Sequence, residues 1–78
     1  MTIKEQMCER IYLTKKNRGL TYDAIVEICN GGIHKSQLTL ILKHSGESVS
    51  LETIEYVLNK LDIEVKVEFV EKLDDFFD

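Results

Sequence analysis

Apolar residues at the start of the chain recur three and four positions apart, which is the spacing of one face of an α-helix. They are Ile3, Met7, Cys8 and Ile11. Thr2 and Glu5 stand three residues apart, as in a capping box, in which the two residues satisfy each other's backbone N–H groups. A first helix is therefore predicted from Ile3 to Lys16, ended by the following Asn17-Arg18-Gly19.

Two shorter segments with the same periodicity follow. Thr21 is placed to cap a second helix of about nine residues, which Asn30-Gly31-Gly32 would end. The expected inward face of this helix consists of Ala24, Ile25, Ile28 and Cys29. A third helix is predicted from Ile33 to His44, with Leu38, Ile41 and Leu42 inward and polar side chains on the other side.

Ser50 has the position and the chemistry of a cap for a fourth helix. The inward stripe of that helix is expected to be Leu51, Ile54, Val57, Leu58 and Leu61. Asp62 interrupts the pattern, and from Ile63 the period changes to two. Ile63, Val65, Val67 and Phe69 alternate with charged residues, which predicts a β-strand with one apolar face.

A single strand leaves its backbone donors and acceptors without partners, and no second strand pattern of similar strength occurs in the chain. Pairing with the same strand of a second chain is favoured, because two-fold homodimers are the commonest oligomers. The alternative is pairing with an N-terminal or loop segment of the same chain. The expected organisation is a helical domain at 1–62, a dimerisation strand at 63–70 and a tail at 71–78. The tail, with acids and two phenylalanines, either docks on the domain or binds another protein.

A chain of 78 residues holds one domain with a modest core and leaves little room for a large catalytic cleft. Its 44% hydrophobic and 31% charged residues are typical of a folded soluble protein. Neither a membrane-spanning run nor a signal peptide is recognisable, so a cytoplasmic location is expected. Cys8 and Cys29 are expected to be reduced and partly buried. No metal site or cofactor is expected, because His34 and His44 do not pair with a cysteine at the short spacing of structural zinc sites.

The formal net charge of −4 is unevenly distributed along the chain. Residues 1–45 contain seven bases and four acids, a net charge of +3, whereas residues 46–78 contain three bases and ten acids, a net charge of −7. A basic binding face followed by an acidic remainder would have this polarity. Chance asymmetry in a short chain is the alternative.

Two short helices joined by a glycine-containing turn, with the second helix polar on its outer side, are the elements of a helix-turn-helix. In such a motif the second helix presents its N-terminal residues to base edges in the major groove of double-stranded DNA. Gln37 suits adenine, Lys35 suits guanine, and Ser36 or Thr39 suits a base or a phosphate. Further candidates for DNA contact are His34 and Lys43 on the third helix, Thr21 at the start of the second, and Lys16 and Arg18 for the phosphate backbone. The alternative is a polar helix face that is simply solvated.

From Arg18 to Val67 the sequence resembles the lambda-repressor-like, or XRE/Cro, helix-turn-helix family. The matching stretches are Gly19-Leu20-Thr21, Ile33-His34-Lys35-Ser36-Gln37-Leu38, Ser50-Leu51-Glu52-Thr53-Ile54 and Leu61-Asp62-Ile63-Glu64-Val65. The turn Asn30-Gly31-Gly32 is about two residues longer than is usual in that family.

This resemblance implies a mostly α, compact domain of four to five helices that binds a two-fold operator as a dimer and regulates transcription, as repressors of phages and mobile elements do. It places base reading at Lys35, Ser36, Gln37 and Thr39, and phosphate contacts at Thr21 and near Lys43. The C-terminal strand fits a Cro-like variant in which strands of two subunits pair.

A protein-interaction module on the same fold is the alternative function. An antirepressor or antitoxin-like protein of this kind would bind another regulator through its acidic C-terminal half, and a fold does not fix a function. An enzyme is not expected, since the sequence has no recognisable nucleophile–histidine pair, phosphate-binding glycine loop or paired-carboxylate cleft.

Overall fold

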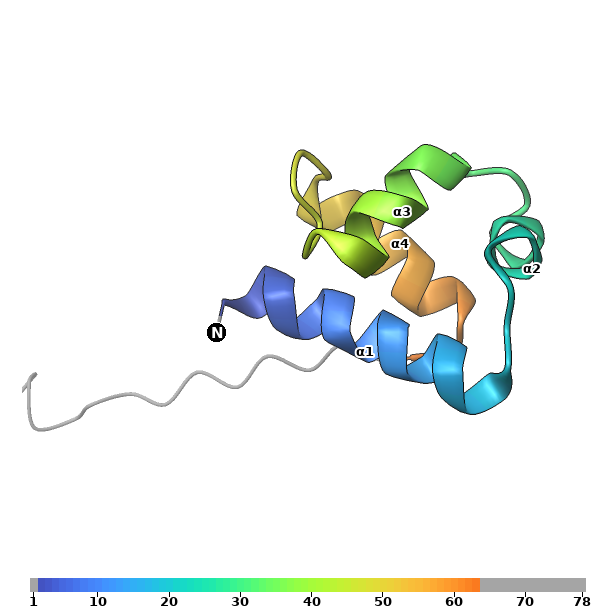
Figure 1. Cartoon of the computed structure of the whole chain (residues 1–78). Coiled ribbons are helices and arrows are strands. Elements are labelled where there is room, and N and C mark those ends of the chain that lie inside the picture. The colour runs from blue at the N-terminus through green and yellow to red at the C-terminus, as the bar shows by residue number, and fades with distance from the viewer. Residues whose placement is uncertain (1, 64–78) are drawn as a thin grey trace, which may run out of the picture.

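Four α-helices follow one another in the part of the chain that the computed structural model describes, residues 2–63 (Figure 1). Their bounds are Ile3–Arg18 for α1, Tyr22–Ile28 for α2, Lys35–Lys43 for α3 and Leu51–Lys60 for α4. All four predicted helices are confirmed, with shifted ends. The second has seven residues instead of about nine. The third begins at Lys35 and not at Ile33, because Ile33 is part of the preceding turn and only 2% exposed.

Three of the helices begin at a hydroxyl side chain that accepts a hydrogen bond from a backbone N–H three residues later. The distances are 3.1 Å at Thr2, 3.0 Å at Thr21 and 3.2 Å at Ser50. Glu5 completes the capping box by accepting from the backbone N–H of Thr2 at 3.3 Å. The predicted caps are therefore confirmed, and each satisfies a donor that the helix cannot satisfy itself.

Three helices end in the same way, with a residue in the left-handed region after the last turn. Gly19, Asn30 and Asp62 have φ values of 63°, 53° and 61°. In each case the N–H of the next residue bonds the carbonyl five positions back, at 2.9, 3.1 and 2.9 Å, as in a Schellman motif. Glycine and asparagine are common at this position, and the role of Asp62 as a helix terminator is confirmed.

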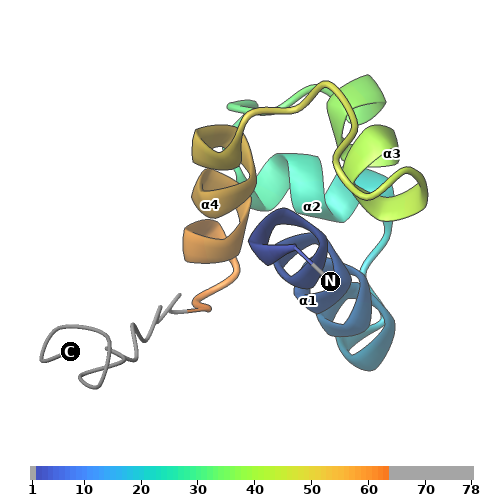
Figure 2. The same cartoon turned by 90° about the vertical axis from the view of Figure 1, so that its left-hand side faces the viewer.

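The core lies where α1 packs against both α3 and α4, and α2 packs against α3 (Figure 2). The buried residues are Met7, Cys8, Ile11, Ile25, Cys29, Ile33, Leu38, Ile41, Val49, Ile54, Val57, Leu58 and Leu61. Most of the predicted inward faces are thus confirmed, and residues 2–63 form a compact all-α domain.

Three residues of the predicted apolar faces are exposed instead of buried. Ile3, the first residue of α1, is 51% exposed. Ile28, the last residue of α2, is 37% exposed, and Leu51, the first residue of α4, is 50% exposed. Near Ile28 and Leu51, residues just outside the helices are buried instead: Cys29 is 0% exposed and Val49 is 4% exposed. At these two helix ends the core is therefore filled by residues of the turns.

The predicted strand and tail lie mostly outside the described residues. This applies to Val65, Val67 and Phe69 of the dimerisation strand and to the tail at 71–78. Ile63 is described; it is not in a strand, and its side chain packs partly buried against the core. Residues 2–63 contain no strand and no fifth helix. None of the helices in that range is long and apolar enough to cross a lipid bilayer.

Candidate nucleic-acid interface

The segment between α2 and α3 is fixed by its own hydrogen bonds and by one buried side chain. Asn30 and Gly31 both have positive φ, 53° and 74°. The Gly31 N–H donates to Val26 O at 3.1 Å, and the Gly32 N–H donates to Cys29 O at 2.9 Å. Ile33 then enters the core. The turn is therefore a defined structure, and it sets the angle at which α3 leaves α2.

Tyr56 of α4 holds the same turn from outside the two helices. Its hydroxyl donates to Cys29 O at 2.8 Å. The face of Gly32 lies directly against the ring, so that a Cβ added there would stand 2.5 Å from the Tyr56 hydroxyl oxygen. The ammonium group of Lys60 lies over this ring, 5.5 Å from its centroid. A side chain distant in sequence thus supports the longer turn, and only glycine leaves room for it.

Helix α3 is anchored on one side and open on the other. Leu38 and Ile41 are 0% and 1% exposed and fasten α3 to the core, whereas Lys35, Ser36 and Lys43 are exposed. Both views place α3 along an outer edge of the molecule (Figures 1 and 2). No acidic residue occurs from 28 to 46. Of the four helices described, α3 is the one with exposed bases and no acid.

Several side chains expected to read bases already have partners within the protein. The Gln37 side-chain oxygen accepts from the His34 N–H at 3.1 Å, which fixes the start of α3. The Thr39 hydroxyl donates to Lys35 O at 3.0 Å. Lys35 Nζ pairs with Asp23 Oδ1 of α2 at 3.2 Å. On this face Ser36 and Lys43 are the expected contact residues for which the described part of the chain shows no such partner.

The two histidines stand at the ends of α3. His34 is the residue before the first turn, with an extended backbone, and His44 follows the last turn. Both are exposed. Together with the two lysines they give the outer side of α3 donors along its whole length.

The candidate phosphate contacts outside α3 differ in whether their side chains are free or already bonded within the protein. Thr21 is exposed, and its hydroxyl oxygen caps α2. Lys16 is exposed near the end of α1. Arg18 was expected to be available to DNA, but its guanidinium donates to Leu61 O at 3.0 Å and so joins the ends of α1 and α4. Lys15 lies over the Tyr22 ring, 5.3 Å from the centroid.

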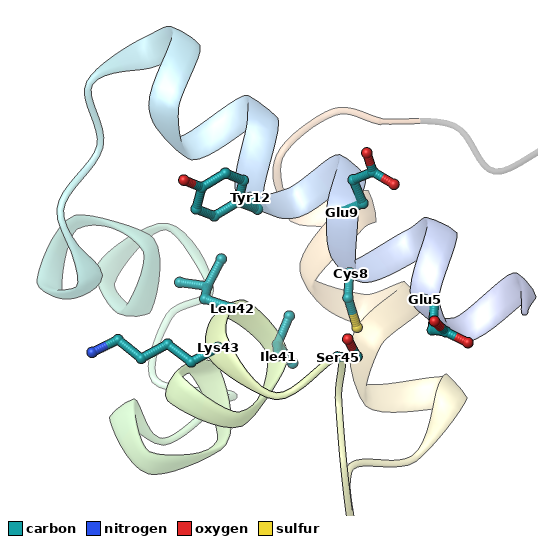
Figure 3. A pocket seen from close by; sticks show the side chains of 8 residues that line it. All are labelled: Glu5, Cys8, Glu9, Tyr12, Ile41, Leu42, Lys43 and Ser45. Carbon is teal, nitrogen blue, oxygen red and sulfur yellow. The ribbon is translucent and has the colours of Figure 1, made fainter. Parts of the chain in front are cut away.

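A shallow groove of about 290 Å³ separates α1 from the end of α3 (Figure 3). It is lined by Glu5, Cys8, Glu9, Tyr12, Ile41, Leu42, Lys43 and Ser45. Cys8 points from α1 toward Ser45 across the groove, and Lys43 extends away from it, to the outer side of α3 (Figure 3). The ammonium group of Lys43 therefore belongs to the exposed face of α3 more than to the groove.

The two thiols are not activated for chemistry. Both cysteines are free and buried, as expected. Burial raises the pKa of the Cys8 thiol, and of the Cys29 thiol, more than the nearby Lys4 and Lys60 lower them. A thiol with a raised pKa is a poor nucleophile at neutral pH. Among residues 2–63 no three His, Cys, Asp or Glu side chains are grouped so that they could hold a metal ion.

Two residues important for this interface were not recognised from the sequence. Tyr56 gives no local signal, because its partners are 24 and 27 residues away; the adjacent glycines of the turn were the one indication of a close approach. Asp23 was not among the residues expected near this interface, although the structure pairs it with Lys35 of α3. Comparison of the chain with protein-family models, with curated proteins and with solved structures gives no match in any of the three.

Proposed function

We propose that this chain is a sequence-specific DNA-binding regulator in which α2 and α3 form a helix-turn-helix of the lambda-repressor-like kind. The observation that carries the proposal is the outer face of α3, which exposes bases and hydroxyl groups, carries no acid and is fastened to the core by Leu38 and Ile41. The major groove of B-DNA is wide enough for one α-helix, and nine residues of helix span about 13 Å.

The polar residues of α3 differ in how available they are for contact with DNA. Ser36 and Lys43 are accessible and have no partner in the described part of the chain, so they are the first choice for direct contact with DNA. Gln37 holds the start of the helix through its side-chain oxygen, which leaves its NH₂ group for a base. Thr39 and Lys35 would reach DNA only with a change of partner.

Dimerisation belongs to the same proposal. Two recognition helices one turn of DNA apart, about 34 Å, are needed to read a two-fold operator. The alternating pattern that follows Ile63 in the sequence would pair two chains, and the acidic C-terminal half would then lie away from the DNA. A dimer bound in this way at a promoter would repress transcription. The proposed location of the protein is the cytoplasm, where it would have access to the DNA.

The test is a titration of the full chain with DNA from around its own gene and with a random duplex of equal length, followed by fluorescence anisotropy. Specific binding predicts a higher affinity for the native DNA and a steep dependence on salt. Lys43→Ala should weaken binding to both duplexes and flatten the salt dependence by about 0.9 in log–log slope, the amount expected for one phosphate contact. Arg10→Ala is the matched control, because Arg10 is exposed on α1 and the substitution removes the same charge away from the α2–α3 motif.

No binding to either duplex at low salt would overturn the proposal. In that case the protein-interaction function would become the better explanation, with a protein partner for the acidic half. Equal losses for Lys43→Ala and Arg10→Ala would also exclude α3 as the contact face, since only the overall charge would then matter.

A further inference from the structure

An ion pair crosses from α2 to α3 at the end of α3 that is proposed to enter the DNA. Lys35 Nζ lies 3.2 Å from Asp23 Oδ1. The Asp23 side chain is 82% exposed and that of Lys35 is 62% exposed, so both groups also face solvent. Whatever approaches the start of α3 therefore meets an anion and a cation side by side.

A lysine in such a pair contributes less to DNA binding than a lysine alone. Binding to DNA depends on salt because counterions are released when a lysine or arginine neutralises a phosphate. Lys35 already has an anion beside it, and a phosphate that reaches its ammonium group must displace the carboxylate or share the site with it. The carboxylate also repels the phosphate directly.

The pair is not required for the fold. Both residues are exposed, and the cap of α2 is the Thr21 hydroxyl. The start of α3 is held by the hydrogen bond between His34 N–H and Gln37. Exposed ion pairs contribute little to stability. Asp23 is therefore placed where its main effect falls on the charge of the proposed contact surface.

We infer that Asp23 competes with DNA phosphate for Lys35 and so lowers the affinity of this chain for DNA of any sequence. This inference rests on the proposed function and deepens it. Because phosphate contacts contribute to specific and to non-specific binding, Asp23 would act on both from α2.

The size of the effect follows from counterion release. If Asp23→Asn frees Lys35 for one phosphate, the log–log salt slope should become steeper by about 0.9. That corresponds to roughly eightfold tighter binding at 0.1 M salt, relative to 1 M salt. Asn keeps the shape of the side chain and removes its charge.

The experiment measures binding of the full chain to a fluorescein-labelled random duplex by anisotropy, over a series of potassium chloride concentrations. The variants are Asp23→Asn, Lys35→Ala and the two combined. Asp62→Asn is the control of equal charge, because Asp62 follows α4 and lies outside the α2–α3 motif. Asparagine tolerates the left-handed backbone at that position. Circular dichroism checks that each variant is folded.

The inference requires that Asp23→Asn tightens binding and steepens the salt slope, while Asp62→Asn leaves the slope unchanged. It also requires that Lys35→Ala has a small effect in the native chain and cancels the gain in the Asp23→Asn chain. Equal gains from Asp23→Asn and Asp62→Asn, or no gain from Asp23→Asn in a chain that binds DNA, would overturn the inference and leave the proposed function standing. Failure of all the variants to bind at low salt would overturn both.

Discussion

The contact between Gly32 and Tyr56 predicts a strongly non-additive pair of substitutions. The backbone of Gly32 is not in the positive-φ region, and the atoms nearest to a Cβ there would belong to Tyr56, with the hydroxyl oxygen at 2.5 Å and Cζ at 2.7 Å. Gly32→Ala must therefore push the ring aside. The ring would lose its hydrogen bond to Cys29 O and its contact with Lys60.

The magnitude follows from these two interactions. A hydrogen bond of this kind contributes about 0.5–1.5 kcal/mol, and an exposed cation–π contact about 0.5–1 kcal/mol. Cys29 O keeps the hydrogen bond from the Gly32 N–H, so no acceptor is left unpaired. Gly32→Ala should thus lower the free energy of unfolding by about 1–2.5 kcal/mol. In a Tyr56→Ala chain the same substitution should be neutral, or stabilising by up to about 1 kcal/mol, because alanine reduces the entropy of the unfolded chain.

The assay is urea unfolding followed by the helix signal in circular dichroism, for the two single variants and the double variant. Gly31→Ala is the matched control in the same turn, since its added Cβ meets nothing within 4 Å but its φ is +74°. Its cost should come from the backbone and be the same with or without Tyr56. A cost of Gly32→Ala that does not change when Tyr56 is removed would refute the assignment of the contact.

Four further predictions concern stability and reactivity. Gly46→Ala should cost roughly 2–5 kcal/mol, because φ is +76° and the new Cβ would stand 2.8 Å from the sulfur of Cys8, and thermal unfolding measures this. Asp62→Gly should raise the free energy of unfolding by up to about 1 kcal/mol, because φ is 61°, and Asp62→Ala should lower it. Hydrogen bonds from the N–H and hydroxyl of Thr2 lower the pKa of Glu5. The stabilisation from the capping box is therefore fully present above the ordinary pKa of 4.5, and it is lost as the pH falls through the lowered pKa. Glu5→Gln should therefore flatten the acid side of the stability curve. Because burial raises the thiol pKa of Cys8 and Cys29, both should react with a disulfide reagent only as fast as the protein opens.

Each of these predictions has a contrary result. If the Gly46→Ala protein is as stable as the native chain, there must be room for a methyl group beside Cys8, contrary to the packing described above. Equal effects of glycine and alanine at position 62 would show that the positive φ is not a source of strain. If the Glu5→Gln protein unfolds in acid at the same pH as the native chain, protonation of Glu5 is not the cause of that transition. Rapid labelling of either thiol in folded protein would contradict its burial.

The elements that could be predicted from the sequence depend on interactions a few residues long. Thr2, Thr21 and Ser50 cap helices because a hydroxyl reaches an N–H three residues away in any fold. The periodic apolar positions gave most of the core, with Leu38 and Ile41 as examples. The errors at Ile28 and Leu51 arose at helix ends, where periodicity no longer indicates which residue turns inward.

The contacts that define the candidate site join distant parts of the chain, and they could not be predicted from periodicity. Arg18 meets Leu61, and Tyr56 meets the turn at Cys29. Asp23 meets Lys35 only because the angle between α2 and α3 brings their first turns together. The sequence indicated which side chains belong to the outer face of α3. Which of them are already engaged depends on tertiary packing.

The junction at the end of α4 has a mechanical consequence. The Ile63 N–H bonds Leu58 O at 2.9 Å, Arg18 of α1 bonds Leu61 O at 3.0 Å, and the Ile63 side chain packs on the core. A force applied at Ile63 would therefore be transmitted to both α1 and α4. Ile63, the last residue that the structure describes, is thus held in a fixed position relative to both α1 and α4.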